Sequence, residues 1–432
     1  MTGPADSTAA DLIASAEAVL RGNDLGDYTK PSPRLYPHQW NWDSAFIAIG
    51  WAHFDWPRAA REIDALLATQ WTDGMLPHIR YNPSVTDYHP GPEWWPGTPV
   101  RHAGVITSGM SQPLVLPTAV YTVGLLQPDG HTRRAWWTRL CEPLCEAVLY
   151  FSRHRTLGDS PLIAIIHPWE SGLDNSPRWG FAVRAGHRPS RTYRRIDNTV
   201  VDASMRPTQA DYDLYMYLVE QIAASRYDMR SYLPRASFVV YDALFNAVWY
   251  RAATDLNRIA GAVGTAPVVS ESDLRTFRDA YHSTLWNESA HLFRDFDARS
   301  GTQIPVDTIA GLSAIYAGLV DADQATAMLA RCRARSKGCR MIPSTPPDQA
   351  GFDPARYWCG PVWVNTNWMM TRGLEALGLL GEARALTRET LDLVRDSGPH
   401  EFYNPYTGMG IGGSDFSWTA ALTIDLLRRP VA

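Results

Sequence analysis

Apolar residues recur every three to four positions through most of the chain, which is the spacing of one face of an α-helix. No sustained alternation typical of β-strands is visible. The pattern predicts about twelve or thirteen helices, over residues 8–20, 40–54, 57–70, 113–126, 134–154, 209–225, 237–262, 271–285, 307–319, 323–334, 361–378, 380–396 and 416–428. That number is the one an (α/α)6 toroid needs, so the sequence predicts an all-α barrel.

Long connections separate these helices. They are rich in Gly, Pro and Trp, and they cover residues 72–112, 155–208, 286–306, 335–360 and 397–415. Loops of this length in a folded domain are usually functional. Because no low-complexity linker divides the chain, we expect one catalytic domain over 1–432, with the loops gathered over one mouth of the barrel.

Composition narrows the classes of partner. A net charge of −5 on 432 residues gives no field that attracts nucleic acid or an anionic membrane. The chain has 17 Trp and 19 Tyr beside 12 Phe, and such flat rings with a polar edge suit the faces and hydroxyls of sugars. Large aromatics also fill cores, and composition alone favours that explanation.

The cysteines indicate a reduced, cytoplasmic protein. They are odd in number, show no CxxC spacing, and stand at Cys141, Cys145, Cys332, Cys339 and Cys359. No secretion signal and no apolar run long enough to span a membrane are visible. The His residues are scattered and no HExxH motif occurs, so we expect neither a metal nor another cofactor. The sequence leaves open whether the protein forms a homo-oligomer.

Three segments carry the candidate chemistry. The first, YPHQWNWD, ends at Asp43 with Trp40 and Trp42 just before it, where a helix is predicted to begin. Asp43 could hydrogen-bond two neighbouring sugar hydroxyls, or it could only cap the helix. Since a cap needs no flanking Trp, we favour sugar binding.

The second segment, WESGLDNSPRW, covers residues 169–179 and contains Asp174 among turn-forming residues. Burial of a carboxyl in a Trp-lined pocket raises its pKa toward the range of a general acid. The same residues are also a plain turn signature. The third segment, EFYNPYTG, places Glu401 on a loop before the last helix. Glycoside hydrolysis needs two carboxyl groups, and Asp174 and Glu401 are our candidates.

These segments, together with YWCGPVW at 357–363 and SWTAA at 417–421, occur in the order found in glycoside hydrolase family 63. The chain resembles that family from about residue 20 to 427, and most of all its bacterial members that hydrolyse glucosylglycerate and mannosylglycerate. The resemblance implies an (α/α)6 fold and an inverting mechanism on an α-linked glucose or mannose. It also implies Asp174 as the general acid and Glu401 as the general base.

Matched position by position, the resemblance implies two groups of substrate-binding residues. The sugar subsite would be lined by Tyr36, Trp40, Trp42, Asp43, Gln112, Trp179 and Trp363. The acid aglycone would be held by Tyr88, Arg206 and Tyr212. An Arg suits this task because its guanidinium can engage a carboxylate at two points, although Arg206 could also be an ordinary surface residue.

The chain departs from the family pattern at two places. Cys359 stands where the family has Arg, and Phe416 stands where the glycerate-cleaving members often have Gln, next to Asp415. These changes leave open a hydrolase of another small α-glucoside or of an oligosaccharide end. A catalytically silent sugar-binding protein is a further alternative, disfavoured because both acids are present. Residues 342–351 could form a mobile lid or a static turn.

Overall fold

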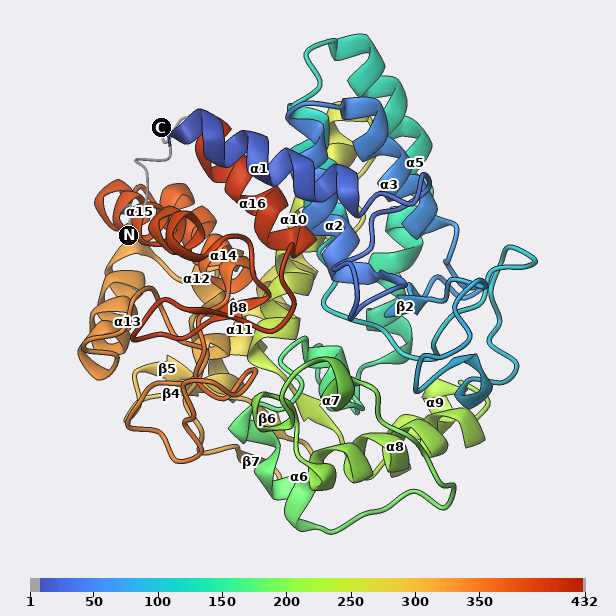
Figure 1. Ribbon diagram of the computed structural model, residues 1–432. Helices are drawn as coiled ribbons and strands as arrows, with labels where there is room; N and C mark the ends of the chain where they lie inside the picture. Colours follow the sequence, from blue (N-terminus) through green and yellow to red (C-terminus); the bar gives the residue numbers. More distant parts are fainter. Residues whose placement is uncertain (1–7, 430–432) are drawn as a thin grey trace.

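Six helices contact one another in a closed ring, and most of them can be found by their labels in Figure 1. The computed structural model describes residues 8–429, so the two ends of the predicted 1–432 domain lie outside the described residues. Around the ring, each helix contacts the next one and the last contacts the first. In this order the members are α2 (Asn41–Ala52), α4 (Leu116–Leu125), α10 (Ala243–Val263), α12 (Ser313–Ala317), α14 (Val364–Ala376) and α16 (Ser417–Arg428).

A second set of helices packs outside the ring. Helix α1 contacts α16, α3 contacts α2, α5 contacts α4 and α10, α11 contacts α10, and α15 contacts α14 and α16. With α13, this set comprises α1 (Ala9–Gly22), α3 (Trp56–Leu67), α5 (Gly130–His154), α11 (Glu271–Leu285), α13 (Ala322–Arg335) and α15 (Leu380–Ser397).

The residue pattern explains which helices are inside. In α2 all twelve residues are buried, as expected for a helix that is surrounded on every side. In α3 the buried positions include Ala59, Ile63 and Leu66, which repeat at intervals of three and four and so define one face. Asp55 caps the N-terminal end of α3, and its side chain accepts a hydrogen bond from the Arg58 amide. The ring helices therefore form the core, and the outer helices cover it with one apolar face each.

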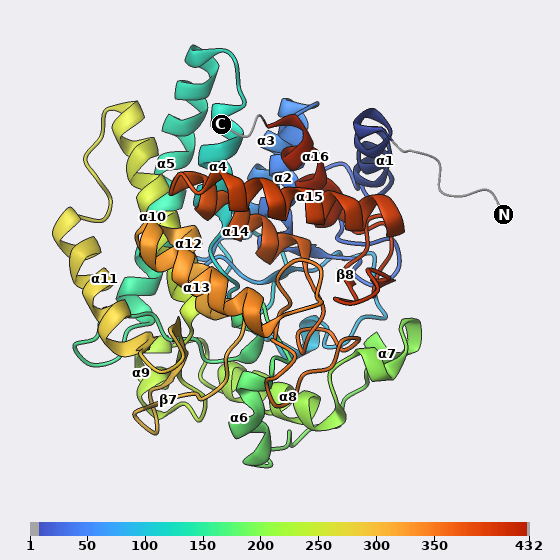
Figure 2. The same cartoon turned by 90° about the vertical axis from the view of Figure 1, so that its left-hand side faces the viewer.

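The connection between α5 and α10 carries four further helices, which lie on one side of the ring in both views (Figures 1 and 2). They are α6 (Gly180–Arg184), α7 (Asp197–Val200), α8 (Gln209–Ala224) and α9 (Met229–Tyr232). Short 3-10 helices are η1 (Pro92–Trp94), η2 (Pro168–Ser171), η3 (Pro177–Trp179), η4 (Ala203–Met205), η5 (Leu233–Arg235) and η6 (Ile309–Leu312).

The strands in the described chain are two residues long and all pair antiparallel. Pairing joins β1 to β2, β4 to β5 and β8 to β9, while β6 lies between β3 and β7. Their bounds are β1 (Gln39–Trp40), β2 (Ile79–Arg80), β3 (Val240–Tyr241), β4 (Trp286–Asn287), β5 (Leu292–Phe293), β6 (Phe296–Asp297), β7 (Thr302–Gln303), β8 (Phe402–Tyr403) and β9 (Gly410–Ile411).

Each predicted helix overlaps a helix of the structure, so the mostly helical fold is confirmed. The largest errors in helix starts concern the predictions over 237–262 and 307–319, because α10 begins only at Ala243 and α12 only at Ser313. Val240 and Tyr241 pair with β6 instead, and the Asp242 side chain caps the helix by accepting from the Phe245 amide. None of the helices described is both long enough and apolar enough to cross a bilayer.

Candidate active site

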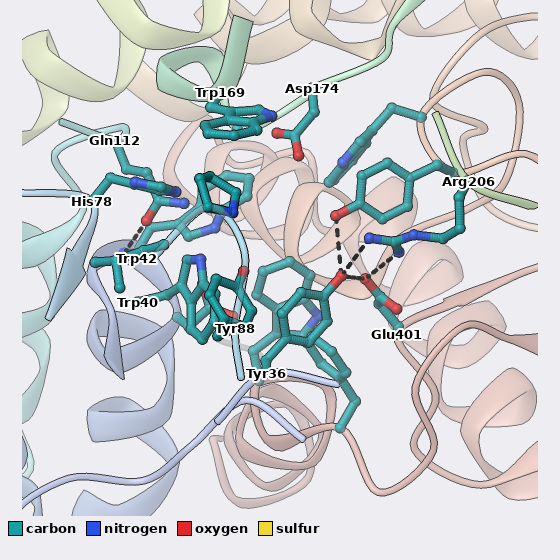
Figure 3. Close-up of a pocket in the computed structure, with 18 of the residues that line it drawn as sticks. Tyr36, Trp40, Trp42, His78, Tyr88, Gln112, Trp169, Asp174, Arg206 and Glu401 are labelled. Atoms are coloured by element: carbon teal, nitrogen blue, oxygen red, sulfur yellow. Dashed lines mark hydrogen bonds and ion pairs between the residues drawn. The ribbon is translucent and has the colours of Figure 1, made fainter. Parts of the chain in front are cut away.

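A pocket opens where the N-terminal ends of α2 and α16 meet the long loops (Figure 3). Its empty space is about 760 Å³, counting the part open to solvent. The residues that line it are Tyr36, Trp40, Trp42, Asp43, His78, Ile79, Tyr81, Tyr88, Pro90, Trp95, Gln112, Trp169, Gly172, Asp174, Arg206, Tyr212, Tyr357, Trp358, Glu401, Phe416 and Trp418. Aromatic side chains therefore dominate the wall, and three carboxyl groups face one space.

The wall contributed by β1 and α2 is closely packed. Trp42 packs edge-on against Trp418, with ring centroids 5.5 Å apart, and its amide donates to the Gln112 side chain at 3.2 Å. Gly172 lies against the Trp42 ring, and a Cβ atom at Gly172 would come within 2.5 Å of it. Gly172 also has a φ of +74°, a left-handed conformation that glycine adopts without strain. The loop that carries Asp174 can therefore approach the aromatic wall only because this residue is glycine.

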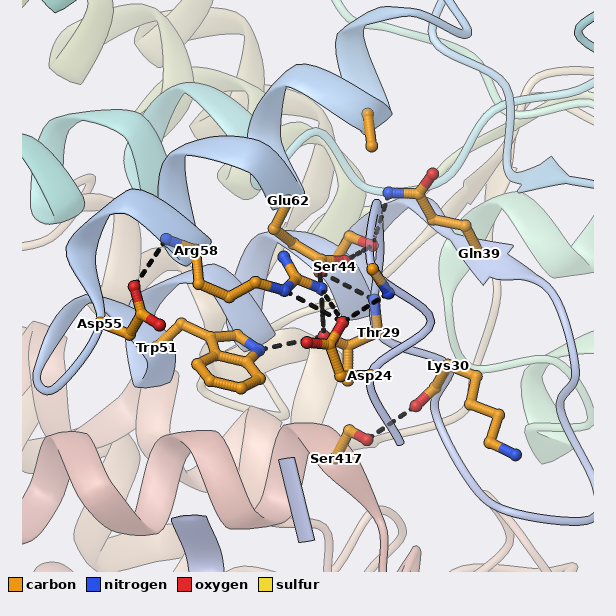
Figure 4. Close-up of polar contacts among 12 residues, drawn as sticks. Asp24, Thr29, Lys30, Gln39, Ser44, Trp51, Asp55, Arg58, Glu62 and Ser417 are labelled. Carbon is orange, nitrogen blue, oxygen red and sulfur yellow. Dashed lines mark hydrogen bonds and ion pairs between the residues drawn. The ribbon is translucent and has the colours of Figure 1, made fainter. Parts of the chain in front are cut away.

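A buried polar network fixes this wall to the outer helix α3 (Figure 4). The Ser44 hydroxyl, one residue after Asp43, donates to Glu62 at 2.6 Å and accepts from the Gln39 amide group at 3.0 Å. Glu62 is buried and paired with Arg58 at 2.9 Å. Burial raises the pKa of Glu62, and the Arg58 guanidinium opposes that effect. Because the network spans β1, α2 and α3, it holds the position of the aromatic side chains in this wall.

Asp174 projects into the pocket from the turn between η2 and η3. Among the described residues, no side chain donates a hydrogen bond to its carboxyl group. Burial raises the pKa of Asp174 to about 8, and the nearby Glu401 adds to this shift while Arg206 opposes it. Asp174 is therefore suited to hold a proton at neutral pH and to donate it.

Glu401, directly before β8, has the opposite surroundings. Its Oε1 accepts from the Tyr36 hydroxyl at 2.6 Å and lies 3.6 Å from Arg206 Nη1. Its Oε2 accepts from the Gly413 amide at 3.0 Å. Two hydrogen-bond donors and one cation therefore surround the Glu401 carboxyl group. Figure 3 shows this cluster apart from the Asp174 carboxyl.

Asp43 lies in the first turn of α2 and lines the pocket. The residue at the N-cap is Trp40, so Asp43 does not cap the helix. Burial raises the pKa of Asp43 well above its ordinary value, and the charges of Glu401 and Asp174 act in the same direction. This third carboxyl is available to hydroxyl groups of a bound molecule.

Arg206 lines the pocket beside Glu401 and carries a positive charge. Its Nη2 donates to the Tyr36 hydroxyl at 3.1 Å, and its Nε lies 3.5 Å from Asp197. Its Nη1 has no hydrogen-bond partner among the described residues, although the atom is buried. Tyr88 and Tyr212 line the same pocket. A guanidinium with a free N–H beside two tyrosines can bind an anionic group.

Ten of the twelve residues selected from the sequence line this one pocket, and two do not. Trp179 and Trp363 were predicted to line the sugar subsite, but both lie behind the pocket. The Trp179 indole donates to the Leu173 carbonyl at 3.0 Å, which closes the Asp174 turn. Trp363 stacks on Trp358, with ring centroids 3.6 Å apart, so Trp358 is the residue that faces the pocket.

Several residues that line the pocket belong to the sequence motifs but were not among the predicted site residues. Trp169 begins the WESGLDNSPRW segment, Tyr357 and Trp358 begin YWCGPVW, and Trp418 belongs to SWTAA. The motifs were thus a sufficient signal for the region, and the error lay in choosing among their aromatics. His78 belongs to no motif, and no local signal marked it.

The two departures from the family pattern occupy different places. Phe416 lines the pocket and packs edge-on against Tyr36, with centroids 5.9 Å apart. Cys359 does not line it, and its thiol donates to the Asn175 carbonyl at 3.2 Å behind the Asp174 turn. Within residues 8–429, no group of three or more His, Cys, Asp or Glu side chains is arranged to hold a metal ion.

Comparisons with known proteins identify the family of the chain. The family model described as the mannosylglycerate hydrolase MGH1-like glycoside hydrolase domain matches residues 36–419. The chain is 38% identical to a mannosylglycerate hydrolase of Rubrobacter radiotolerans, over 98% of both chains. It is 34% identical to a glucosylglycerate hydrolase of Mycolicibacterium hassiacum, over 97% of this chain and 98% of the relative.

Among solved structures, the chain is similar to the GH63 mannosylglycerate hydrolase from Thermus thermophilus in complex with Tris and D-glycerate. The TM-score is 0.90 at 36% identity, and the match covers 96% of this chain and 99% of the other.

Proposed function

Because the chain belongs to the mannosylglycerate hydrolase MGH1-like glycoside hydrolase family, we propose that it hydrolyses the α-linkage between a hexose and glycerate. The hexose is glucose or mannose. The chain is a glycoside hydrolase, and the observation that supports the assignment of its catalytic groups is the contrast between two carboxyls in one Trp-lined pocket. Asp174, with a raised pKa, is the general acid, and Glu401, among donors and a cation, is the general base.

In the proposed reaction, Asp174 gives its proton to the glycosidic oxygen as the bond from the anomeric carbon to that oxygen breaks. Glu401 takes a proton from the water whose oxygen attacks the anomeric carbon from the opposite face. The products are free hexose with inverted configuration and glycerate. Asp43, Gln112 and the aromatic wall bind the sugar, and Arg206 with Tyr88 and Tyr212 binds the carboxylate of the aglycone.

We also propose that the described chain forms a single (α/α)6 toroid. The closed ring of contacts from α2 through α16 back to α2, with outer helices packed against it, supports this architecture. In such a barrel the N-terminal ends of α2 and α16 and the loops before α4 and α14 converge on one mouth. Residues distant in sequence, such as Asp43 and Glu401, then share one pocket.

The test is hydrolysis of a small panel of substrates followed by NMR. Mannosylglycerate, glucosylglycerate and the neutral glucosylglycerol separate the sugar from the aglycone preference. We expect turnover of a glycerate glycoside, with the β-anomer of the sugar as first product. Release of the α-anomer would contradict inversion. Equal turnover of glucosylglycerol would favour the alternative that Phe416 suggests, a hydrolase of another small α-glucoside. No turnover of any member would favour a sugar-binding protein.

A further inference from the structure

The Asp174 carboxyl has no side-chain donor among the described residues, so its direction depends on how its backbone is held. The turn has several anchors. The Tyr215 hydroxyl donates to the Asp174 carbonyl at 2.8 Å, and the Trp358 amide donates to the Asn175 side chain at 3.1 Å. The next residue, Ser176, is buried, and its hydroxyl oxygen accepts from Arg178 Nε at 3.1 Å.

Arg178 is the centre of a buried ion cluster outside the pocket. Its Nη1 donates to Asp242 at 2.8 Å and to Asp295 at 2.5 Å. The guanidinium also lies 4.4 Å from the centre of the Trp179 ring. The side chains of Arg178 and Asp295 are 1% exposed and that of Asp242 is 0% exposed, so the cluster is shielded from solvent.

The cluster connects the Asp174 turn to a helix of the ring. Asp242 caps α10, since its Oδ1 accepts from the Phe245 amide at 2.6 Å. Asp295 Oδ1 accepts from the Ala243 amide at 2.7 Å, also at the start of α10. Backbone amides therefore fix both carboxylates. The carboxylates accept hydrogen bonds from Arg178, and Arg178 donates a further one to Ser176.

Such a cluster is a poor means of stabilising a fold. Two carboxyls share one guanidinium, and removing three ionisable groups from water costs more than a hydrophobic cluster of the same volume would. Burial raises the pKa of Asp242 to about 7, which reflects this cost. In some proteins, buried ions are retained because they impose one geometry.

We propose that Arg178, fixed by Asp242 and Asp295, is a positioning residue that directs the Asp174 carboxyl at the glycosidic oxygen. This inference rests on the proposed function, in which Asp174 donates the proton. Loss of the cluster then slows the departure of leaving groups that must be protonated. It has little effect on a leaving group that departs without a proton, because the Glu401 side of the pocket stays intact.

The experiment compares two substrates of the same sugar: the glycerate glycoside and the α-glycosyl fluoride, whose fluoride ion leaves without full protonation. We expect Arg178→Lys to lower kcat for the glycerate glycoside by about 10- to 100-fold, the loss typical of a misplaced catalytic group. Ser176→Ala should lower it by roughly 3- to 10-fold, as for a lost hydrogen bond. Hydrolysis of the fluoride should change less than about 3-fold in both variants.

The matched control is Arg251→Lys. Arg251 also lies beside a carboxylate of α10, Asp255 at 2.7 Å, but neither residue lines the pocket. We expect both substrates to be hydrolysed at wild-type rates. If Arg178→Lys does not fold, Ser176→Ala still tests the idea, because it removes one hydroxyl and leaves the cluster intact. The proposal would be overturned if Arg178→Lys or Ser176→Ala lost activity equally on both substrates. It would also be overturned if Ser176→Ala and a folded Arg178→Lys lost no activity on either substrate.

Asp174→Asn separates failure of this inference from failure of the proposed function. If Asp174 is the general acid, this variant loses its activity on the glycerate glycoside and keeps most of its activity on the α-glycosyl fluoride. If it shows no such difference, the proposed function is wrong. If Asp174→Asn does show this difference, but the Arg178 and Ser176 variants lose activity equally on both substrates, only the positioning inference is wrong.

Discussion

Asp174 and Glu401 face the same pocket, yet their surroundings differ in almost every respect. Asp174 stands on a turn whose backbone is anchored, while its carboxyl has no donor among the described side chains. Glu401 stands directly before a strand, and its carboxyl accepts two hydrogen bonds and lies beside Arg206. The Asp174 environment favours a protonated carboxyl, whereas hydrogen-bond donors and a cation surround the Glu401 carboxyl.

The difference shows how one pocket supplies both an acid and a base without a cofactor in the proposed reaction. Two identical environments would give the two carboxyls similar affinities for protons, and the negative charge of one would only raise the pKa of the other. Here Tyr36 and Arg206 contact Glu401, and the charge of Glu401 raises the pKa of Asp174. The contrast is therefore partly built by the pair itself.

The strongest test of this contrast is to remove each carboxyl. Asp174→Asn and Glu401→Gln should each lower turnover of the glycerate glycoside by about 10²- to 10⁴-fold, the usual contribution of a general acid or base. Initial rates on protein verified as folded by circular dichroism measure the loss. Wild-type turnover in either variant would exclude that residue from the mechanism.

The next largest effect should come from Arg206, which serves both ends of the comparison. Arg206→Ala should raise KM for a glycerate glycoside by about 10- to 150-fold, corresponding to about 1.5–3 kcal/mol for a charged hydrogen bond. Since Arg206 also donates to Tyr36, which donates to Glu401, kcat should fall for charged and neutral substrates alike. Steady-state kinetics on glucosylglycerate and glucosylglycerol separate the two effects. A KM increase of the same size for glucosylglycerol would contradict the carboxylate contact.

The pH dependence should show the acid directly. Because the active form of Asp174 carries a proton and burial raises its pKa to about 8, kcat for the glycerate glycoside should fall above about pH 8. Well above that value the decrease should approach tenfold for each pH unit, as for loss of one required proton. The α-glycosyl fluoride is the control, and its hydrolysis should lack this basic limb. A limb of equal size with both substrates would assign it to another group.

The sequence was a good guide to the helices and to the motifs, and a weaker one to individual side chains. Helical periodicity is local, so it predicted α1 and α11 nearly to the residue. The orientation of a loop residue depends on contacts from elsewhere in the chain. The motif YWCGPVW therefore indicated the pocket, but its stacking placed Trp358 rather than Trp363 at the surface of the pocket.

The residues that support the Asp174 turn could not be predicted from local sequence for the same reason. Arg178 meets its partners Asp242 and Asp295 across 64 and 117 positions of sequence. Nothing in the turn signature around Asp174 reveals a cluster assembled from such distant segments. The raised pKa of Asp174 was predictable in direction, because burial beside Trp acts in one direction only.

Stability should show the smallest effect, with opposite signs at the two carboxyls. The pKa of Asp174 rises from 3.8 to about 8 on folding, so between these values the folded chain keeps a proton that the unfolded chain releases. Stability is therefore lost as the pH rises through this window.

Asp174→Asn removes that penalty and should raise Tm at pH 8 by roughly 1–3 °C, with little change near pH 4. Glu401→Gln should instead lower Tm, because it removes one of the two carboxylates beside the buried Arg206. Thermal unfolding of both variants and the wild type at the two pH values makes the comparison. A lower Tm for Asp174→Asn than for wild type at pH 8 would mean that the Asp174 carboxyl is stabilised in the folded state, contrary to its proposed use as an acid.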